Sequence, residues 1–191
     1  MIISNKKILE LNKKYKIIEN LSERELEQPE GVGIDVRIGE AYKLEGEGFL
    51  GVNERKAPEA KKIADIKNGD KEIILKPGDL IVGKTIEKIN LPAKKIVIDK
   101  NEKPRFIMLD IYPRGTLPHC GIDFLLIKGD PGYSGQLTFT LVNVGNCNFR
   151  LELGARIANL IFHSVTGEIH RAYEGQWKGG RVTILKKEKQ N

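Results

Sequence analysis

Residues 130–136 read Asp-Pro-Gly-Tyr-Ser-Gly-Gln and lead into the strand-like run Leu-Thr-Phe-Thr-Leu-Val-Asn. Pro131 fixes its own φ angle and Gly132 can adopt a positive φ, so the segment predicts a tight turn that holds the carboxylate of Asp130 at a fixed angle. Tyr133 adds a flat aromatic face for a sugar or base. A small ligand held beside an acid would suit this turn. On turn chemistry alone, an ordinary hairpin with an Asp-stabilised turn is the simpler interpretation.

Four further segments change that balance. They are Val-Gly-Ile-Asp-Val-Arg-Ile-Gly at 32–39, Tyr-Pro-Arg-Gly-Thr-Leu at 112–117, Leu-Gly-Ala-Arg-Ile-Ala-Asn-Leu-Ile-Phe at 153–162 and Tyr-Glu-Gly-Gln-Trp-Lys-Gly-Gly-Arg-Val at 173–182. Together with 130–136, in this order, they resemble the dUTPase and dCTP deaminase superfamily over roughly residues 1–182. The opening Met-Ile-Ile-Ser and residues 75–85 look like its archaeal, deaminase-like branch of dUTP diphosphatases.

The resemblance implies a fold, an assembly and a choice of reactions. Such proteins form a distorted jelly roll or β-barrel, the dUTPase-like β-clip, and assemble as homotrimers, with active sites between subunits; a hexamer is also open. The dUTPase members cleave dUTP to dUMP and pyrophosphate with Mg²⁺. The deaminase members convert dCTP to dUTP, and some members do both.

The same resemblance assigns roles to individual residues. Asp130 matches the catalytic aspartate, which can orient and deprotonate a water for attack on the α-phosphorus. Tyr133 matches the aromatic residue under the deoxyribose, and Arg114 matches an arginine whose fork suits phosphate oxygens. Asp35 matches an aspartate near the waters of Mg²⁺, although a turn-stabilising Asp at a strand end is nearly as good an interpretation. The pyrimidine edge would be read by the backbone at 129–132 and by the strand that carries Gln136, Thr138 and Thr140.

Position 140 separates the two reactions. In deaminases the strand after the tight turn carries a glutamate, which shuttles the proton during attack on the cytosine ring. Here the position holds Thr140. A threonine hydroxyl has no useful pKa near neutrality and cannot replace that carboxylate. Thr140 therefore favours hydrolysis of dUTP over deamination of dCTP.

Other positions depart from the family pattern. The second motif reads Arg114-Gly115-Thr116-Leu117 where Arg-Ser-Xaa-Leu is usual, so Gly115 supplies a backbone N–H but no hydroxyl, and Thr116 can compensate only in part. His119 stands where the deaminase-like branch often has arginine, and Asn159 where glutamine is common. These changes leave three possibilities open: a dUTP diphosphatase, a mono- or bifunctional dCTP deaminase, and an impaired homologue that binds a nucleotide or regulates.

The C-terminal segment has the composition of a lid. Its glycines give it freedom to fold over a site. Tyr173 or Trp177 could stack on the base, Lys178 and Arg181 could meet the γ-phosphate, and Gln176 lies in the same motif. A disordered end whose tryptophan packs on the barrel is the alternative interpretation. The expected organisation is a β domain at 1–171 followed by a mobile arm at 172–191.

Bulk composition excludes several classes of protein. Apolar residues make up 40% and charged residues 30% of the 191-residue chain, which is ordinary for a globular protein. The net charge of +6 comes from scattered lysines that suit a solvated surface, and a nucleoside triphosphate would suffice as its anionic partner. The sequence has neither zinc-finger spacing nor an RNP-like aromatic motif, so we do not expect nucleic-acid binding. Without a long apolar run or a signal region we expect no membrane span and a cytoplasmic protein with Cys120 and Cys147 as free thiols.

The pattern along the chain predicts a mainly β fold with one short helix at 5–13 after Ser4. Many short strands at close spacing, without strand–helix alternation, indicate a closed barrel or jelly roll. Segment 55–67 is polar and is expected to be a loop with a helical turn. The expected strands are 15–18, 33–38, 72–75, 79–86, 96–98, 105–112, 122–127, 136–143, 148–152 and 156–163.

Overall fold

The chain begins with a helix that is capped at both ends. In the computed structural model, which describes residues 1–125, 127–184 and 186–189, helix α1 spans Asn5–Tyr15. The Ser4 hydroxyl accepts a hydrogen bond from the N–H of Lys7, and Lys16 ends the helix in the left-handed conformation, with φ of 53°. Ile8 and Leu11 are buried, so this face holds α1 against the sheet. The predicted helix is confirmed and is two residues longer than expected.

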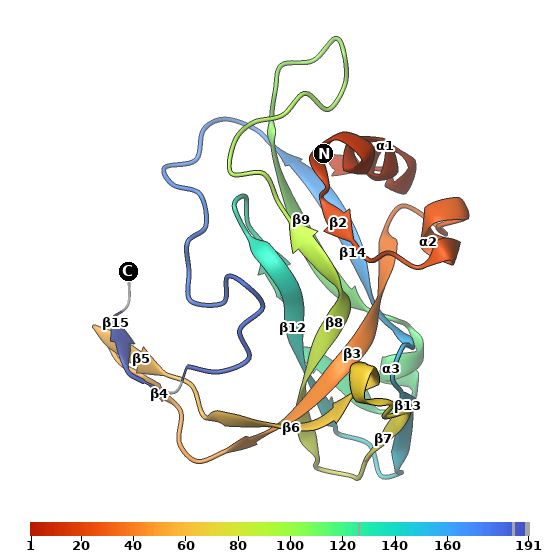
Figure 1. Ribbon diagram of the computed structural model, residues 1–191, viewed down its shortest axis with the longest axis vertical. Coiled ribbons are helices and arrows are strands. Elements are labelled where there is room, and N and C mark those ends of the chain that lie inside the picture. The colour runs from red at the N-terminus through yellow and green to blue at the C-terminus, as the bar shows by residue number, and fades with distance from the viewer. Residues whose placement is uncertain (126, 185, 190–191) are drawn as a thin grey trace.

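One large antiparallel sheet forms the body of the fold. Its main path runs β10-β12-β8-β3-β14-β9-β11, and β1, β2 and β6 pair with β14, β8 and β3 at its margins. The sheet curls into a half-barrel, with α1 and α2 on one side (Figure 1). These strands span Ile2–Ile3 (β1), Ile18–Glu19 (β2), Ile34–Glu45 (β3), Glu59–Asp65 (β6), Leu80–Asn90 (β8), Phe106–Pro113 (β9), Ile122–Leu125 (β10), Lys128–Gly129 (β11), Ser134–Asn143 (β12) and Arg156–Val165 (β14).

Two smaller sheets and three short helical segments complete the described structure. The sheets contain β13 with β7, and β15 with β5 and β4. The mainly β, jelly-roll-like fold is therefore confirmed. The remaining elements are Glu23–Glu27 (α2), Phe49–Leu50 (β4), Glu54–Lys56 (β5), Ile66–Asn68 (η1), Glu72–Leu75 (β7), Thr116–His119 (α3), Phe149–Glu152 (β13) and Glu188–Lys189 (β15).

Strand β12 shows how the sequence pattern fixes the core. Its residues alternate strictly between buried and half-buried. The buried set includes Leu137, Phe139 and Leu141, and Phe139 stacks on Phe124 of β10 with ring centroids 5.0 Å apart. Because successive side chains of a strand point to opposite faces, Gln136, Thr138 and Thr140 share the other face. The core thus orients the polar residues that the sequence assigns to a site.

Several sequence-based boundaries are wrong. Segment 55–67 is mostly strand, because β5 and β6 occupy it; only the expected helical turn appears, as η1. Residues 96–98 form no strand but a single bridge from Ile96 to Arg105. The expected strand at 15–18 starts inside α1, and β2 begins at Ile18. The expected strand at 122–127 ends at Leu125; residue 126 lies outside the described residues.

The remaining expectations concern thiols and membranes. Cys120 and Cys147 are both exposed free thiols, as predicted. Across the ranges that the structure describes, the helices are too short or too polar to cross a bilayer.

The C-terminal arm returns across the molecule. Beyond β14 the chain passes the end of β12 and reaches the small sheet that contains β4 and β5 (Figure 1). The carbonyl of Ile184 accepts a hydrogen bond from the N–H of Ala57, and its side chain is 1% exposed. The arm therefore joins β12 to the β4–β5 hairpin. The last two residues, part of the segment at 186–191 expected to be solvated, lie outside the described residues.

Candidate active site

The turn at 130–133 has the tight geometry that its sequence predicts. The carbonyl of Asp130 accepts a hydrogen bond from the N–H of Tyr133 at 3.0 Å, and Gly132 has a φ of 95°. Leu91 fixes the turn from outside through two backbone hydrogen bonds, to Gly132 and Tyr133. The carboxylate of Asp130 is partly exposed, and its Oδ1 lies 2.8 Å from Nζ of Lys128. Asp130 is thus positioned by a rigid turn and faces solvent beside one cation.

Tyr133 forms a wall of the site. It is 8% exposed, and its hydroxyl donates a 2.6 Å hydrogen bond to the carbonyl of Gln136. Burial raises the pKa of Tyr133 well above its usual value. The ring of Tyr173 lies against it, with centroids 5.8 Å apart and planes tilted by 50°. Tyr133 therefore stays neutral at physiological pH and offers a surface rather than a proton.

A cavity of about 640 Å³ brings six of the predicted site residues together: Asp130, Tyr133, Thr138, Thr140, Tyr173 and Trp177. Its volume lies within the usual range of about 300–1,000 Å³ for small-molecule sites. Most of the lining is apolar, and Asp130 is the only carboxylate among the described residues that line it. The other lining residues are Leu44, Ala57, Pro58, Val82, Leu125, Ile127, Lys128, Leu137, Phe139 and Val182. We call it the apolar cavity.

A second cavity of about 330 Å³ adjoins the first through Asp130 and Tyr173, which line both. Its lining includes two arginines, Arg55 and Arg171, and the carboxylate of Glu174; Pro131, Ile169, Ala172 and Gly175 complete it. We call it the cationic cavity. Sequence reasoning missed Arg55 and Arg171. Asp130 therefore lies at the junction of an apolar and a cation-lined space.

Gln136 is placed near the site, but its side chain is already used. Its Nε2 donates a 2.6 Å hydrogen bond to the carbonyl of Thr85, across an irregularity in the β12–β8 pairing. The Thr85 hydroxyl accepts from the N–H of Leu137 in the same place. These bonds fix β12 beside the apolar cavity. Gln136 itself does not line either cavity.

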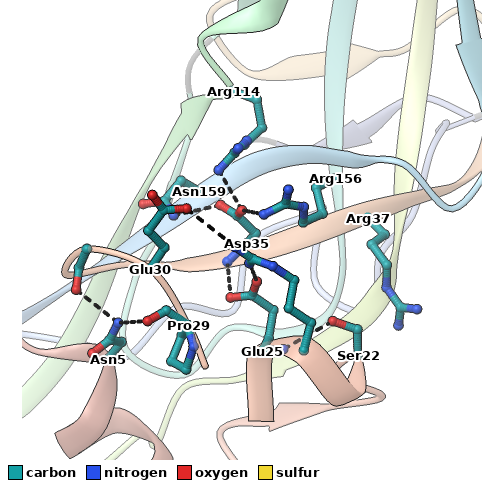
Figure 2. A network of polar contacts seen from close by, with 12 residues as sticks. Asn5, Ser22, Glu25, Pro29, Glu30, Asp35, Arg37, Arg114, Arg156 and Asn159 are labelled. Carbon is teal, nitrogen blue, oxygen red and sulfur yellow. Dashed lines mark hydrogen bonds and ion pairs between the residues drawn. The ribbon is translucent and has the colours of Figure 1, made fainter. Parts of the chain in front are cut away.

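Asp35, Arg114 and Asn159 come together in a separate cluster (Figure 2). Asp35 is 3% exposed. Its Oδ2 accepts hydrogen bonds from Nη1 of Arg114 at 2.6 Å and of Arg156 at 2.8 Å, and its Oδ1 accepts from Nδ2 of Asn159 at 2.8 Å. Its backbone N–H donates to Glu25. Sequence reasoning missed Arg156, whose only signal was its place in the segment 153–162.

The packing of this cluster explains why position 33 is a glycine. A Cβ atom on Gly33 would lie 1.9 Å from Oδ1 of Asn159 and 2.7 Å from its Cγ. A side chain at position 33 would therefore displace the amide that bonds Asp35. The cluster depends on the absence of a side chain there.

The arrangement of Asp35 does not fit a ligand to the waters of Mg²⁺. Its two oxygens accept three hydrogen bonds from cationic or amide groups, and its side chain faces protein. The described residues contain no group of three His, Cys, Asp or Glu side chains suited to a metal ion. A metal role for Asp35 stays a prediction that would require both arginines to move. As the side chains lie, Asp35 is the counter-ion of Arg114 and Arg156.

The rest of the second motif follows Arg114. Gly115 precedes the short helix α3, and a Cβ atom added there would meet no heavy atom within 4 Å, so a serine would fit. Leu117 is 3% exposed and belongs to the core. Thr116 and His119 are the first and last residues of α3. None of these residues lines either cavity.

The arm contacts the site through its backbone as well as its aromatic residues. The N–H of Gly179 donates a 2.6 Å hydrogen bond to the carbonyl of Ser134. The backbone of the arm packs closely against β12 here: a Cβ atom on Gly135 would lie 2.4 Å from the backbone N of Gly180. Trp177 lines the apolar cavity, so the arm forms part of the wall of the cavity in its own chain, and its role as a lid stays a prediction.

The polar residues of the arm point elsewhere. Nζ of Lys178 lies 3.5 Å from the carbonyl of Tyr173, and Arg181 pairs with Glu188. Gln176 has a buried Oε1 without a hydrogen-bond partner in the described structure. The assignments of Lys178 and Arg181 to a γ-phosphate, and the mobility of the arm, stay predictions.

Deleting the arm after Arg171 is expected to lower turnover of the nucleotide at least tenfold, because the truncation removes Tyr173 and Trp177 from the apolar cavity. The deletion also removes the buried side chain of Ile184 and the hydrogen bond between its carbonyl and Ala57, so stability is expected to fall. Single-turnover kinetics with the double variant Tyr173→Ala/Trp177→Ala separates the two effects, since it keeps the backbone contacts of the arm. Unchanged turnover in both proteins would exclude a lid.

Comparison with known proteins identifies the family. The family model described as dCTP deaminase-like matches residues 2–165. A protein of Dictyoglomus turgidum named dCTP deaminase, dUMP-forming, is 26% identical over 178 residues, covering 91% of this chain and 85% of its own. A probable deoxyuridine 5'-triphosphate nucleotidohydrolase of Methanosarcina acetivorans is 28% identical over 165 residues, covering 85% and 86%.

A solved structure confirms the fold. The 2'-deoxycytidine 5'-triphosphate deaminase from Agrobacterium tumefaciens matches with a TM-score of 0.59 and 13% identity, over 84% of this chain and 47% of that one. The match of the family model covers most of the half-barrel and the turn that carries Asp130. The chain belongs to the dCTP deaminase-like family.

Proposed function

We propose that the protein is a dUTP diphosphatase, which hydrolyses dUTP to dUMP and pyrophosphate. Members of its family act on pyrimidine deoxynucleotides, and its relatives carry the names of both a dUMP-forming dCTP deaminase and a dUTP nucleotidohydrolase. The question is which bond this chain attacks. The position of the carboxylates around the two cavities supports the choice.

The observation that carries the proposal is that Asp130 is shared by the apolar and the cationic cavity, whereas Thr140 lines the apolar cavity alone. A nucleotide with its base in the apolar cavity and its phosphates in the cationic one would place the α-phosphorus near Asp130. The ring would then meet Thr140, which has no carboxylate to move a proton. This arrangement suits attack on phosphorus and not on the pyrimidine ring.

Another carboxylate on the same sheet face does not replace the missing one. Glu40 of β3 is paired with Lys84 of β8, which is paired with Thr138 of β12, so Glu40 is two strands, roughly 10 Å, from β12. Glu40 is 8% exposed and bonds to Lys62 and to the Tyr42 hydroxyl. Burial opposes its ionisation, but the bonds from Lys62 and Tyr42 outweigh burial and lower the pKa of Glu40. It stays ionised, paired and outside the lining of the apolar cavity.

In the proposed reaction, Asp130 orients a water and takes its proton as the oxygen attacks the α-phosphorus in line. The bond between the α-phosphorus and the bridging oxygen breaks, and pyrophosphate leaves with the electron pair. Lys128, 2.8 Å from Asp130, holds the carboxylate in place. Tyr133 packs under the deoxyribose, where its bulk would exclude a 2'-hydroxyl. Arg55 and Arg171, the arginines of the cationic cavity, stabilise the charge of the leaving group.

Mg²⁺ is part of this proposal. Magnesium usually binds through one or two carboxylates together with substrate phosphates. Besides the proposed base Asp130, Glu174 is the other carboxylate among the described residues that line the cationic cavity, and together with the phosphates of the substrate it fits that donor set. Bound there, the ion would neutralise charge on the phosphate oxygens. Assembly as a homotrimer, with sites completed by a neighbouring copy, and a cytoplasmic location are likewise proposed.

A second candidate is a dUMP-forming dCTP deaminase, which the name of the Dictyoglomus relative favours. It requires a proton shuttle other than residue 140. A third is a homologue that binds nucleotides without turnover, which Gly115 and His119 favour. Neither accounts for the placement of Asp130 as directly as hydrolysis does.

A paired assay tests the proposal. Purified protein with Mg²⁺ is given dUTP or dCTP in separate reactions, and the products are resolved by chromatography. We expect dUMP and pyrophosphate from dUTP, and unchanged dCTP. Formation of dUTP or dUMP from dCTP would show that another group replaces the glutamate. If neither nucleotide changes while calorimetry shows binding, the protein is a binding homologue.

A further inference from the structure

An arginine on the β4–β5 hairpin reaches the cavity that contains Asp130. Arg55 belongs to β5, which is joined to β4 on one side and to β15 on the other. The residues matched to the family's motifs lie in other segments. The side chain nevertheless lines the cationic cavity with Asp130, Arg171 and Tyr173. The hairpin thus adds a positive charge next to the proposed catalytic carboxylate.

The guanidinium of Arg55 has no hydrogen-bond or ion-pair partner among the residues that the structure describes. Its Nε is buried and makes no hydrogen bond, and none of the described ion pairs includes it. An arginine keeps its charge at all physiological pH values, and a buried donor without an acceptor is unfavourable. The described structure therefore contains a charged side chain in the wall of a cavity, with no acceptor for its buried Nε. An anion would satisfy it.

The other arginines near the motifs already have a carboxylate partner. Arg114 and Arg156 both bond Oδ2 of Asp35. Arg171, by contrast, is exposed, lines the cationic cavity and has no ion-pair partner in the part of the chain that the structure describes. Two unpaired guanidinium groups therefore lie in the wall that also holds Asp130. Their planar forks suit phosphate oxygens.

The arm fixes the hairpin that carries Arg55. The N–H of Ala57 donates to the carbonyl of Ile184, the Thr183 hydroxyl bonds the carbonyl of Pro58, and Glu188 pairs with Arg55 in the backbone ladder. Gly179 bonds Ser134 at the other end of the arm. Arg55 is therefore held at a set position relative to β12 and Asp130.

We propose that Arg55, with Arg171, binds the β- and γ-phosphates of the nucleoside triphosphate and makes the site selective for triphosphates over monophosphates. The proposal rests on the proposed function, because it assigns the polyphosphate part of the same substrate. The carboxylate of Glu174 lines the cavity as well, and Mg²⁺ on the triphosphate would offset its charge.

The test compares Arg55→Gln with Lys187→Gln, which removes a cation from the neighbouring segment of the same small sheet without touching the cavity. Calorimetry measures binding of dUMP, of tripolyphosphate and of an α,β-imido analogue of dUTP, which stands in for dUTP because it is not cleaved at the α-phosphorus, to each protein with Mg²⁺ present. We expect Arg55→Gln to weaken the binding of the dUTP analogue and of tripolyphosphate about tenfold to a hundredfold, and to leave the binding of dUMP unchanged. Lys187→Gln should bind all three like the original protein. Arg55→Lys, which keeps the charge but not the fork, should fall between.

The outcomes separate this proposal from the proposed function. If the original protein binds dUTP without cleaving it, hydrolysis is wrong, and the binding data still test Arg55. If it cleaves dUTP and Arg55→Gln binds the dUTP analogue as tightly as before, the Arg55 proposal is wrong. Equal weakening of the binding of the analogue and of dUMP would also overturn it, because the effect would then not depend on the terminal phosphates. Thermal unfolding of Arg55→Gln close to that of Lys187→Gln confirms that both fold.

Discussion

Replacement of Asp130 with asparagine is expected to lower the rate of dUTP hydrolysis by about 10²- to 10⁴-fold, the usual contribution of a positioned general base. Asparagine has nearly the same shape and can still accept a hydrogen bond from Lys128, so the turn should persist. What it loses is the ability to take a proton from water. Binding of dUTP should therefore change much less than turnover, with kcat falling and KM staying within a few fold.

The measurement is steady-state release of pyrophosphate, with dUTP affinity measured by calorimetry. Asp99→Asn is the matched control, because Asp99 is an exposed carboxylate that also pairs with a lysine, Lys7, at 2.9 Å. It should retain full activity. Full hydrolysis by Asp130→Asn would show that another group activates the water, and the place of Asp130 between the two cavities would then need a different explanation.

The sequence predicts this part of the site well because the relevant information is local. Asp130, Pro131 and Gly132 determine the turn, and the alternation of β12 places Thr138 and Thr140 on one face. No long-range knowledge is needed to bring these residues together. The apolar cavity, which contains them with Tyr133, follows from that alternation and from the aromatic residues of the arm.

The rest depends on contacts that a single sequence does not reveal. The sequence predicts a loop where β6 lies, because Glu59, Lys61 and Lys62 leave no apolar alternation; only the last two residues of the strand, Ala64 and Asp65, are buried. Its identity as a strand comes from pairing with β3. Arg55 likewise reaches the cavity only because the arm holds its hairpin there. Both features arise from tertiary pairing.

Asp35 is a second residue whose surroundings a sequence match does not reveal. A sequence match assigns it to the waters of a metal ion, but its partners come from segments about 80 and 120 residues away and occupy its oxygens. Figure 2 shows the side chains of Arg114, Arg156 and Asn159 converging on it. Its role as a counter-ion makes a prediction about stability that a metal role does not.

Replacement of Asp35 with asparagine is expected to destabilise the protein by about 2–3 kcal/mol. The substitution leaves the guanidinium groups of Arg114 and Arg156 facing each other without a counter-ion, and its amide places a donor toward donors. Complete burial of both arginines would raise the cost further, but their side chains are 34% and 33% exposed and can turn toward water. Urea unfolding should show a lower midpoint with an unchanged slope.

The control and a second variant decide between the two roles of Asp35. Asp99→Asn removes an exposed, paired carboxylate and should cost less than about 1 kcal/mol. Adding Arg156→Gln to Asp35→Asn removes one of the two positive charges that would repel each other, and should recover part of the stability. If Asp35→Asn is as stable as the control yet needs far more Mg²⁺ for hydrolysis, the carboxylate acts on the metal and the counter-ion role is wrong. Loss of stability that Arg156→Gln partly restores, with no change in the Mg²⁺ requirement, shows that Asp35 holds two arginines in place.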